Sequence, residues 1–247
     1  MRLNRIIKLF EEGNVCVCGL KGRGKDMLMA NVTQRRKLPY VSNVDYGGDH
    51  HVFVPMQYDC GRNTYEDFIA GDLYPYEYPF PDGTDIYISD AGVYFPSQFQ
   101  GDLVKKYGFF CSFMALSRHL GECNVHFNVQ NLNRCWDKIR EQSDIYIMCN
   151  GCRVIFGKFV VQRVTLYESY DSAVRRVPPF RLKKPWFNAD RRFQWDTQRQ
   201  NYAISYGRIE SGLLIYRNKS NYNTRVFKEM LANGTKVYDE NETKKCR

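Results

Sequence analysis

Residues 14–27 read NVCVCGLKGRGKDM, a short β-favouring run followed at once by a loop that contains three glycines and ends in Lys25. Residues 24–37 then space apolar side chains along one face of a helix, which Pro39 stops. A strand, a G-x-x-x-x-G-K loop and a helix form the P-loop, or Walker A motif, whose backbone N–H groups bind a polyphosphate. The competing interpretation is a glycine-rich turn with an incidental lysine. We predict an ATP site formed by Gly19, Lys21, Gly22, Arg23, Gly24, Lys25, Asp26 and Met27.

Asp26 departs from the usual P-loop, in which a Ser or Thr after the lysine reaches Mg²⁺. A carboxylate beside a triphosphate is repelled unless a cation lies between them, so Asp26 is a candidate Mg²⁺ ligand, directly or through water. It equally suits the first turn of a helix, where acidic side chains are favourable. Both interpretations stand, whereas Lys25 is expected to place its ammonium on the β- and γ-phosphates.

Strand and helix signals continue to alternate up to about residue 145. Short apolar runs predict strands, and longer periodic runs between them predict helices at 100–119 and 131–142; the strands are expected at 40–44, 85–90 and 124–129. Alternation at this spacing predicts a mainly parallel sheet with right-handed crossovers. We therefore expect an α/β, RecA-like P-loop ATPase domain over residues 1–145.

Two polar residues end strands of this predicted sheet: Asp90 closes residues 85–90, and Gln130 follows residues 124–129. The carboxyl ends of parallel strands face the same side as the phosphate loop. Asp90 is therefore predicted to order Mg²⁺ or to polarise the attacking water. The alternative is a solvated carboxylate at a strand end. Gln130 is predicted to lie between Asp90 and the P-loop, where its amide would hydrogen-bond a γ-phosphate or the water.

The order of these motifs resembles a known family. It is made up of GLKGRGKD (19–26), IYISDAGVYFPSQF (86–99), a helix ending SRHLG (117–121) and NVHFNVQNLNRCWDKIR (124–140). This order is similar to that of the zonula occludens toxin family of filamentous-phage assembly ATPases, viral members of the FtsK–HerA class of pumping ATPases. The resemblance covers roughly residues 13–150. It implies an ATP-hydrolysing motor that forms rings and acts on single-stranded phage DNA.

Several residue roles follow from the resemblance alone. It implies that Gln130 is a polar sensor and that Arg118, His119 and Arg140 are basic positions able to contact a neighbouring subunit's nucleotide. The family's Asp-Glu-Ala aligns with residues 89–91, which places Asp90 at the catalytic glutamate; sliding by one residue places it at the metal aspartate. In both alignments this chain lacks one of the family's two carboxylates, which argues against rapid ATP hydrolysis. Family members often carry a transmembrane helix after the ATPase domain. Its absence here predicts either a variant that works with a separate membrane protein or a relative that pumps DNA in another setting.

Beyond residue 145 the chain is expected to form a smaller, β-rich and basic domain over residues 146–247. Asn150-Gly151 lies between apolar runs and predicts a two-residue hairpin turn. The flanking Cys149 and Cys152 are then cross-strand neighbours, with half of a zinc site as the alternative. Residues 178–199 are expected to be a loop and 202–217 a second hairpin. Basic and aromatic side chains alternate over 175–199, which suits either single-stranded DNA or packing onto the ATPase domain.

Composition limits the classes of partner and the cellular compartment that we expect for this protein. The net charge of +9 favours an anionic partner such as nucleic acid, nucleotide or a membrane surface. The cysteine count of nine is odd and several lie in apolar runs, so the cysteines are expected to be reduced. No stretch reaches the roughly 18 apolar residues that can span a bilayer. We expect a protein of the host cytoplasm, at or near the inner face of the membrane.

The hypothesis from sequence is thus a motor ATPase that uses ATP and Mg²⁺ to assemble and extrude filamentous phage. Two alternatives stay open. One is a DNA-packaging or conjugative DNA pump, and the other is a nucleotide-dependent assembly scaffold that hydrolyses little.

Overall fold

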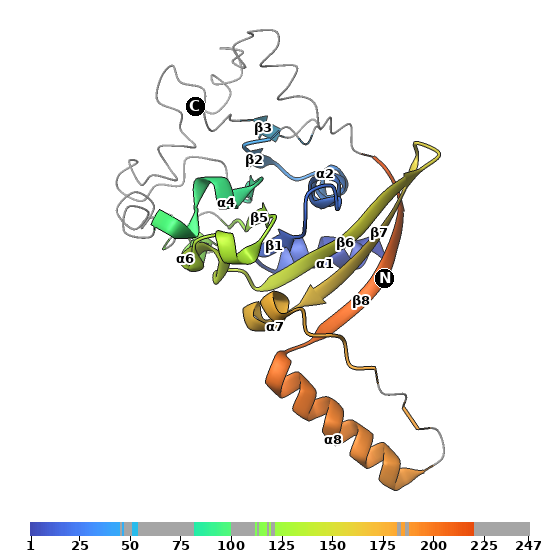
Figure 1. The fold of residues 1–247 in the computed structure, drawn as a ribbon. Helices are drawn as coiled ribbons and strands as arrows, with labels where there is room; N and C mark the ends of the chain where they lie inside the picture. Colours follow the sequence, from blue (N-terminus) through green and yellow to red (C-terminus); the bar gives the residue numbers. More distant parts are fainter. Residues whose placement is uncertain are drawn as a thin grey trace.

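The computed structural model describes residues 1–44, 46, 51–53, 82–99, 112, 114–117, 119, 122–181, 184–185 and 188–219. Its centre is a single sheet with the strand order β3-β2-β4-β5-β1-β6-β7-β8 (Figure 1). The strands are β1 (Val15–Cys18), β2 (Tyr40–Ser42), β3 (His51–Phe53), β4 (Asp85–Ile88), β5 (Val125–Val129), β6 (Ile145–Ile155), β7 (Phe159–Tyr167) and β8 (Ile209–Arg217). The helices are α1 (Leu3–Glu12), α2 (Lys25–Arg36), α4 (Ala91–Tyr94), α6 (Asp137–Arg140), α7 (Tyr170–Arg175) and α8 (Ala189–Tyr206), with 3-10 turns at Ser97–Phe99 and Leu132–Arg134.

The sheet is parallel from β3 to β6 and antiparallel from β6 to β8. The short strands β1, β4 and β5 are buried along their whole length, as expected for parallel strands that are covered on both faces. Strand β5 lies between β4 and β1, so the ends of these three strands meet at one edge, beside the P-loop. The α/β fold with a mainly parallel sheet is confirmed.

Each face of the sheet carries its own apolar core. On one face, α1 and α2 pack over β1 and β6–β8, and α1 contributes Leu3, Ile6 and Phe10 at helical spacing. On the other face, residues of α4, α7 and the 132–139 segment cover β1, β4 and β5. The helices therefore pack on both faces of the sheet. This packing holds in place the carboxyl ends of the strands, beside the P-loop. No helix in the described ranges is both long and apolar enough to cross a membrane.

The sheet does not stop at residue 145. Strand β6 pairs with β1 from Val15↔Ile145 to Cys18↔Met148, and β7 and β8 follow by antiparallel pairing. The described strands of the 146–247 part therefore extend the sheet of the P-loop part. The division of the chain into 1–145 and 146–247 stays a prediction.

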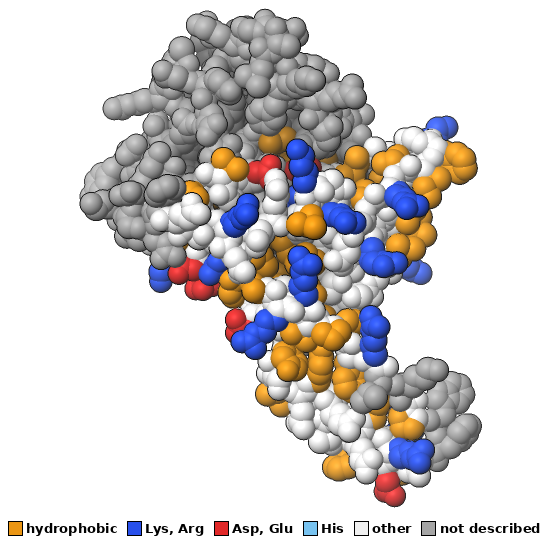
Figure 2. Space-filling view, in the orientation of Figure 1, with side chains coloured by type: hydrophobic (Ala, Val, Ile, Leu, Met, Phe, Trp, Pro, Cys, Tyr) orange, Lys and Arg blue, Asp and Glu red, His pale blue; other side chains and the backbone are white. Residues whose placement is uncertain are grey.

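The hairpin was predicted at the wrong place. Strand β6 runs straight through Asn150-Gly151 as a bulge between Cys149 and Gly151, and the chain turns only at Phe156-Gly157. Cys149 and Cys152 thus lie on one strand, opposite Val164 and Gln162, and are not cross-strand neighbours. Both are free thiols, and the described residues hold no group of three metal-binding side chains. Figure 2 shows apolar side chains gathered at the far end of this hairpin.

The predicted loop holds for the described residues of 178–188 but was wrong for 189–199, and the hairpin predicted at 202–217 was wrong. Residues 189–206 form the exposed helix α8, which extends away from the sheet in Figure 1, and residues 209–217 form the edge strand β8. The side chain of Asn188 caps the helix by accepting hydrogen bonds from the N–H groups of Asp190 (3.0 Å) and Arg191 (3.1 Å). Residues 189–206 contain neither Gly nor Pro, so the helical signals were present in the sequence.

Two expected helices differ in extent from the prediction. The one at 131–142 is split into the 3-10 turn and α6, because the backbone between them is extended and Trp136 N–H donates to Phe95 O at 2.7 Å. Of the one at 100–119, only residues 112, 114–117 and 119 are described, and they are helical. Strand β3 was not predicted.

Candidate nucleotide-binding site

The P-loop connects β1 to α2, as the sequence predicted, and it lies against β6. A Cβ on Gly24 would come within 2.5 Å of Cys152 Cβ, and a Cβ on Gly19 within 2.5 Å of the Cys149 carbonyl oxygen. Gly24 also has a φ of +84°, in the left-handed region that favours glycine. Both glycines are therefore required by contact with the neighbouring strand, in addition to any approach of a phosphate.

The far end of the loop is held by one buried amide. Gln162 of β7 donates from Nε2 to the carbonyl oxygens of Gly24 (3.0 Å) and Arg23 (3.3 Å). Its Oε1 accepts from the Tyr216 hydroxyl of β8 at 3.0 Å. The guanidinium of Arg23 donates to the Asn150 carbonyl in the β6 bulge at 3.1 Å. Strands β6–β8 thus fix the loop from behind, and sequence reasoning missed this contribution.

The loop leaves an anion-binding surface open. In the part of the chain that the structure describes, the backbone N–H groups of Gly22, Gly24 and Lys25 donate to no protein acceptor. Lys25 is only 5% exposed, and within the described residues its ammonium has no hydrogen-bond or ion-pair partner. Unpaired N–H groups at a helix N-terminus and an ammonium without a protein partner together attract a polyphosphate.

A cavity of about 660 Å³ opens in front of this surface, at the carboxyl ends of the parallel strands. It is lined by the loop and α2, by the ends of β4 and β5, by residues after β2 and by β6: Lys21, Gly22, Gly24, Lys25, Asp26, Met27, Asn43, Val44, Ser89, Asp90, Val93, Gln130, Cys152 and Val154. The volume is within the range of pockets that hold small ligands and cofactors. Most of the residues predicted from the sequence therefore meet in one cavity.

Asp26 lies in the first turn of α2 and is the centre of a polar network. Its Oδ1 accepts from Asn128 Nδ2 at 2.7 Å, from Ser89 Oγ at 2.8 Å and from the Tyr46 hydroxyl at 3.4 Å. Asn128 Nδ2 also reaches Ser89 Oγ at 3.1 Å. The amide of Asn43 holds the backbone of Ser89 through two hydrogen bonds, of 2.7 and 3.0 Å.

Asp90 differs from Asp26 in its backbone conformation and in the contacts of its carboxylate. Its φ of +50° places it in the left-handed region, a strained conformation for a residue with a side chain that clusters at functional sites. Its N–H donates to Asn128 Oδ1 at 2.9 Å, which fixes the backbone. Among the described residues its carboxylate has no hydrogen-bond or ion-pair partner. Asp90 therefore presents a free, half-exposed carboxylate to the cavity.

Sequence reasoning did not single out Asn43 and Asn128, which hold this network together; of the two, Asn43 also lines the cavity. Asn128 is completely buried near the end of β5, and Asn43 is buried directly after β2. A polar side chain inside an apolar strand was the available signal, because such a group is buried only when it is hydrogen-bonded.

Other predicted residues lie outside this cavity. Gly19 lines a second cavity of about 220 Å³ on the other side of the loop, which Gln130 also borders. Arg140 donates to the carbonyls of Leu132 and Cys135, both at 3.1 Å, and its guanidinium lies 4.6 Å from the ring centre of Tyr170. His119 is exposed. Arg118 lies outside the described residues.

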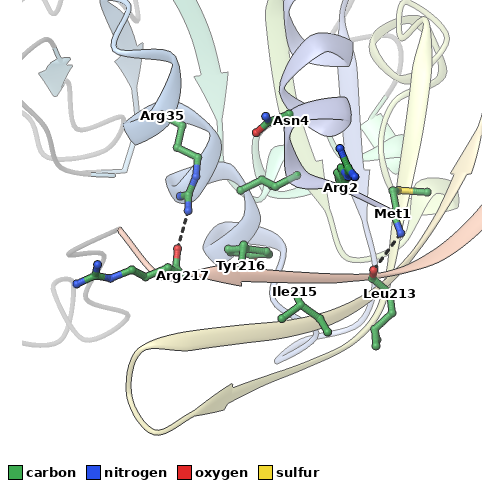
Figure 3. Close-up of a pocket in the computed structure, with 9 residues that line it drawn as sticks. Met1, Arg2, Asn4, Arg35, Leu213, Ile215, Tyr216 and Arg217 are labelled. Atoms are coloured by element: carbon green, nitrogen blue, oxygen red, sulfur yellow. Dashed lines mark hydrogen bonds between the residues drawn. The ribbon is translucent and has the colours of Figure 1, made fainter.

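A third cavity, of about 380 Å³, lies between the start of α1, the end of α2 and β8 (Figure 3). Two of its cationic groups hydrogen-bond the backbone of the edge strand. Arg35 Nη2 donates to Arg217 O at 2.7 Å, and the Met1 ammonium donates to Leu213 O at 3.2 Å. These contacts attach β8 to the two helices.

No protein-family model and no curated protein matches this chain. Among solved structures, the chain is similar to the N-terminal domain of zonular occludens toxin from Neisseria meningitidis, at 12% identity and a TM-score of 0.47 over 87% of this chain and 97% of that one. It is also similar to the genome-packaging NTPase B204 from Sulfolobus turreted icosahedral virus 2 in complex with sulfate, at 19% identity and a TM-score of 0.39 over 55% of this chain and 73% of that one. At such identities and scores, function has to be argued from this chain's own residues.

Proposed function

We propose that this chain binds ATP in the 660 Å³ cavity and hydrolyses it, as a motor for the assembly and extrusion of filamentous phage. One observation carries the nucleotide part of this proposal. Within the described residues, the unpaired ammonium of Lys25, the free N–H groups of the loop and the free carboxylate of Asp90 all border the same cavity. A polyphosphate needs the first two features, and an attacking water needs the third.

Each residue then has a role in phosphoryl transfer. Lys25 and the loop N–H groups bind the β- and γ-phosphates and offset the charge that develops on their oxygens. Asp90 accepts a hydrogen bond from the attacking water and orients it toward the γ-phosphorus. Gln130, whose side chain is exposed at the end of β5, hydrogen-bonds the γ-phosphate or that water. The oxygen donors of Asp26 and Asp90 fit Mg²⁺, which would neutralise phosphate charge when bound.

The motor part of the proposal rests on the sequence. The motif order over residues 13–150 supports a phage-assembly ATPase, and the net charge of +9 supports a polyanionic partner. We propose that the partner is single-stranded phage DNA, that the protein works as a ring, and that a separate membrane protein joins it at the inner face of the membrane. Stimulation of hydrolysis by single-stranded rather than duplex DNA would separate extrusion from duplex packaging.

Two substitutions divide binding from hydrolysis. Lys25→Ala is expected to weaken the binding of a fluorescent ATP analogue by roughly 10–100-fold, because a charge-assisted contact to phosphate is lost. Asp90→Asn is expected to bind the analogue as well as the wild type but to hydrolyse ATP about 10²–10⁴-fold more slowly, because the water loses its base. Titration of fluorescence and release of inorganic phosphate measure the two effects.

Lys8→Ala is the matched control, because Lys8 is exposed on α1 and its substitution removes the same charge away from the cavity. Equal loss of binding in Lys8→Ala and Lys25→Ala would contradict the proposed site. If the wild type binds ATP tightly and neither it nor Asp90→Asn turns ATP over, the chain is an assembly scaffold. That scaffold is the second candidate, favoured by the serine at position 89 where a second acid would be expected.

A further inference from the structure

The metal-binding pair of a P-loop NTPase consists of a hydroxyl and a carboxylate on two different elements. The hydroxyl belongs to the Ser or Thr that follows the P-loop lysine, and the carboxylate belongs to an Asp at the end of a neighbouring strand. This chain has the two chemistries in the opposite places. Asp26 follows Lys25 at the start of α2, and Ser89 follows the last residue of β4.

The two exchanged side chains are in direct contact. Ser89 Oγ donates to Asp26 Oδ1 at 2.8 Å, although the residues are 63 positions apart in the chain. Asn128 Nδ2 lies within hydrogen-bond distance of both, and Asn43 fixes the backbone of Ser89 on both sides. The arrangement is therefore built from three strand ends and a helix, and it is not an incidental surface contact.

The network leaves one oxygen of the pair free. Three donors share Asp26 Oδ1, whereas within the described residues Oδ2 has no partner. The neighbouring Lys25 lines the same cavity, and its ammonium has no protein partner among those residues, which marks the place where phosphate oxygens would lie. Mg²⁺ is typically bound by one or two protein carboxylates together with phosphate oxygens and water, so one free carboxylate oxygen here is a sufficient anchor.

We propose that Asp26 and Ser89 form a Mg²⁺ site in which carboxylate and hydroxyl have exchanged places between the P-loop and the strand end. Asp26 then supplies the carboxylate that the resemblance left missing, and Ser89 is its hydroxyl partner. Asp90 keeps its carboxylate for the attacking water and is not needed for the metal. This inference rests on the proposed nucleotide site, and it assigns to Asp26 more than a favourable charge in the first turn of a helix.

The test reverses the exchange. The variants Asp26→Ser, Ser89→Asp and the double variant Asp26→Ser/Ser89→Asp are compared with the wild type. The measurement is the affinity for a fluorescent ATP analogue in excess Mg²⁺ and again in EDTA. In Asp26→Ser, the increase in affinity that Mg²⁺ produces is expected to be about 10–100-fold smaller than in the wild type. Losses of this size in metal affinity are typical when groups around a metal site are substituted. The double variant is expected to regain most of it, because it restores the usual placement of the two groups.

Each outcome bears on one claim. An unchanged Mg²⁺ enhancement in Asp26→Ser would show that Asp26 serves only the helix N-terminus, and a double variant no better than Asp26→Ser would also overturn the exchange. No binding of the analogue to the wild type, with or without Mg²⁺, would instead refute the proposed function.

A second measurement covers variants that fail to fold. Asp26→Asn keeps the size of the side chain and an acceptor for Ser89 and Asn128. In the presence of ATP, it is expected to lose the electron paramagnetic resonance signal of bound Mn²⁺ that the wild type shows. Retention of that signal would overturn the proposal.

Discussion

Gly24 shows how one position serves both the loop and the sheet. Its φ of +84° is unfavourable for any residue with a Cβ, and the space where a Cβ would lie is taken by Cys152. Gly83 offers a comparison, because its φ is +79° and no atom of the described residues lies within 4 Å of the point that a Cβ would occupy. The two glycines therefore differ in crowding and share the same backbone constraint.

Alanine substitutions should separate these two effects. Gly83→Ala is expected to lower the free energy of unfolding by about 1–2 kcal/mol, the cost of a left-handed conformation. Gly24→Ala is expected to cost a further ~1–3 kcal/mol, because the methyl group overpacks against β6. Urea unfolding measures both values. Equal losses in the two variants would mean that the contact between the P-loop and Cys152 is not tight.

At the scale of elements, β6 is the strand on which the site depends most. It pairs with β1, and the Asn150 carbonyl in its bulge accepts a hydrogen bond from the guanidinium of Arg23. It also contributes Cys152 and Val154 to the cavity. The Asn-Gly pair at 150–151 has the preferred chemistry of a tight turn, yet it forms the bulge. The turn itself is made by Phe156-Gly157, with φ values of +51° and +63°. Phe156 is 89% exposed and gains little from burial.

Moving turn chemistry to the observed turn should stabilise the protein. Phe156→Asn is expected to raise the free energy of unfolding by about 1 kcal/mol, because Asn adopts positive φ more readily than Phe. Phe159→Asn is the control, since Phe159 is a half-exposed strand residue paired with Ile155, and its loss should not stabilise. Denaturant unfolding of both variants decides the matter. A gain of the same size in Phe159→Asn would show that removing an exposed apolar side chain, and not the turn, was responsible.

At the scale of the whole molecule, the carboxyl ends and the amino ends of the parallel strands carry different polar clusters. The nucleotide cavity is at the carboxyl ends of the strands. A second cluster, at the amino ends, joins Arg36 at the end of α2, Asp85 at the start of β4 and His126 of β5. Asp85 forms an ion pair with Arg36 and accepts from the Asn124 N–H at 2.8 Å. His126 Nε2 lies 3.5 Å from Asp85 Oδ2, an electrostatic contact rather than a good hydrogen bond.

Burial sets the protonation of this cluster. Burial lowers the pKa of His126 and outweighs the opposing effect of Asp85, so the imidazole is neutral in the folded state. His126 Nδ1 accepts from the Val15 N–H at 3.3 Å, which assigns the proton to Nε2, facing Asp85. Burial alone would raise the pKa of Asp85, but His126, Arg36 and the Asn124 N–H together lower it. The cluster is therefore an anchor for the fold and takes no part in the proposed chemistry.

Both shifts predict loss of stability in acid. A lowered pKa means that the unfolded chain binds the proton more readily, so the free energy of unfolding falls as pH drops. The contribution of His126 is complete above about pH 6.5, the pKa of a free imidazole, and that of Asp85 is lost only at lower pH, near and below about 4. Urea midpoints measured between about pH 7 and pH 5 should therefore fall in the wild type.

Histidine substitutions identify the source of this slope. His126→Gln is expected to flatten the pH dependence in this window, even if it lowers stability throughout. His119→Gln is the control, because His119 is exposed and its loss should leave the slope unchanged. The same slope in His126→Gln as in the wild type would rule out His126 as its source.

The features that the sequence by itself determined depend on residues that are close together along the chain. A β-favouring run, a glycine loop with Lys25 and an amphipathic helix need only local propensity, and they suffice to predict the P-loop. Apolar runs that end in Asp90 and Gln130 place both residues at the carboxyl edge, because parallel strands share a direction. The α/β class and most of the cavity lining follow from such local patterns.

Tertiary structure alone decided the rest, because the deciding contacts join residues far apart in the chain. Asn128 reaches Asp26 across 102 positions, and Gln162 reaches Gly24 across 138. Strand β6 pairs with β7 on both sides of Asn150-Gly151, so this pair forms a bulge despite its preference for a turn, and pairing with β7 makes residues 209–217 an edge strand. The pairing of Asp26 with Ser89 could not be predicted either, because each is an ordinary residue until the folded chain brings the two together.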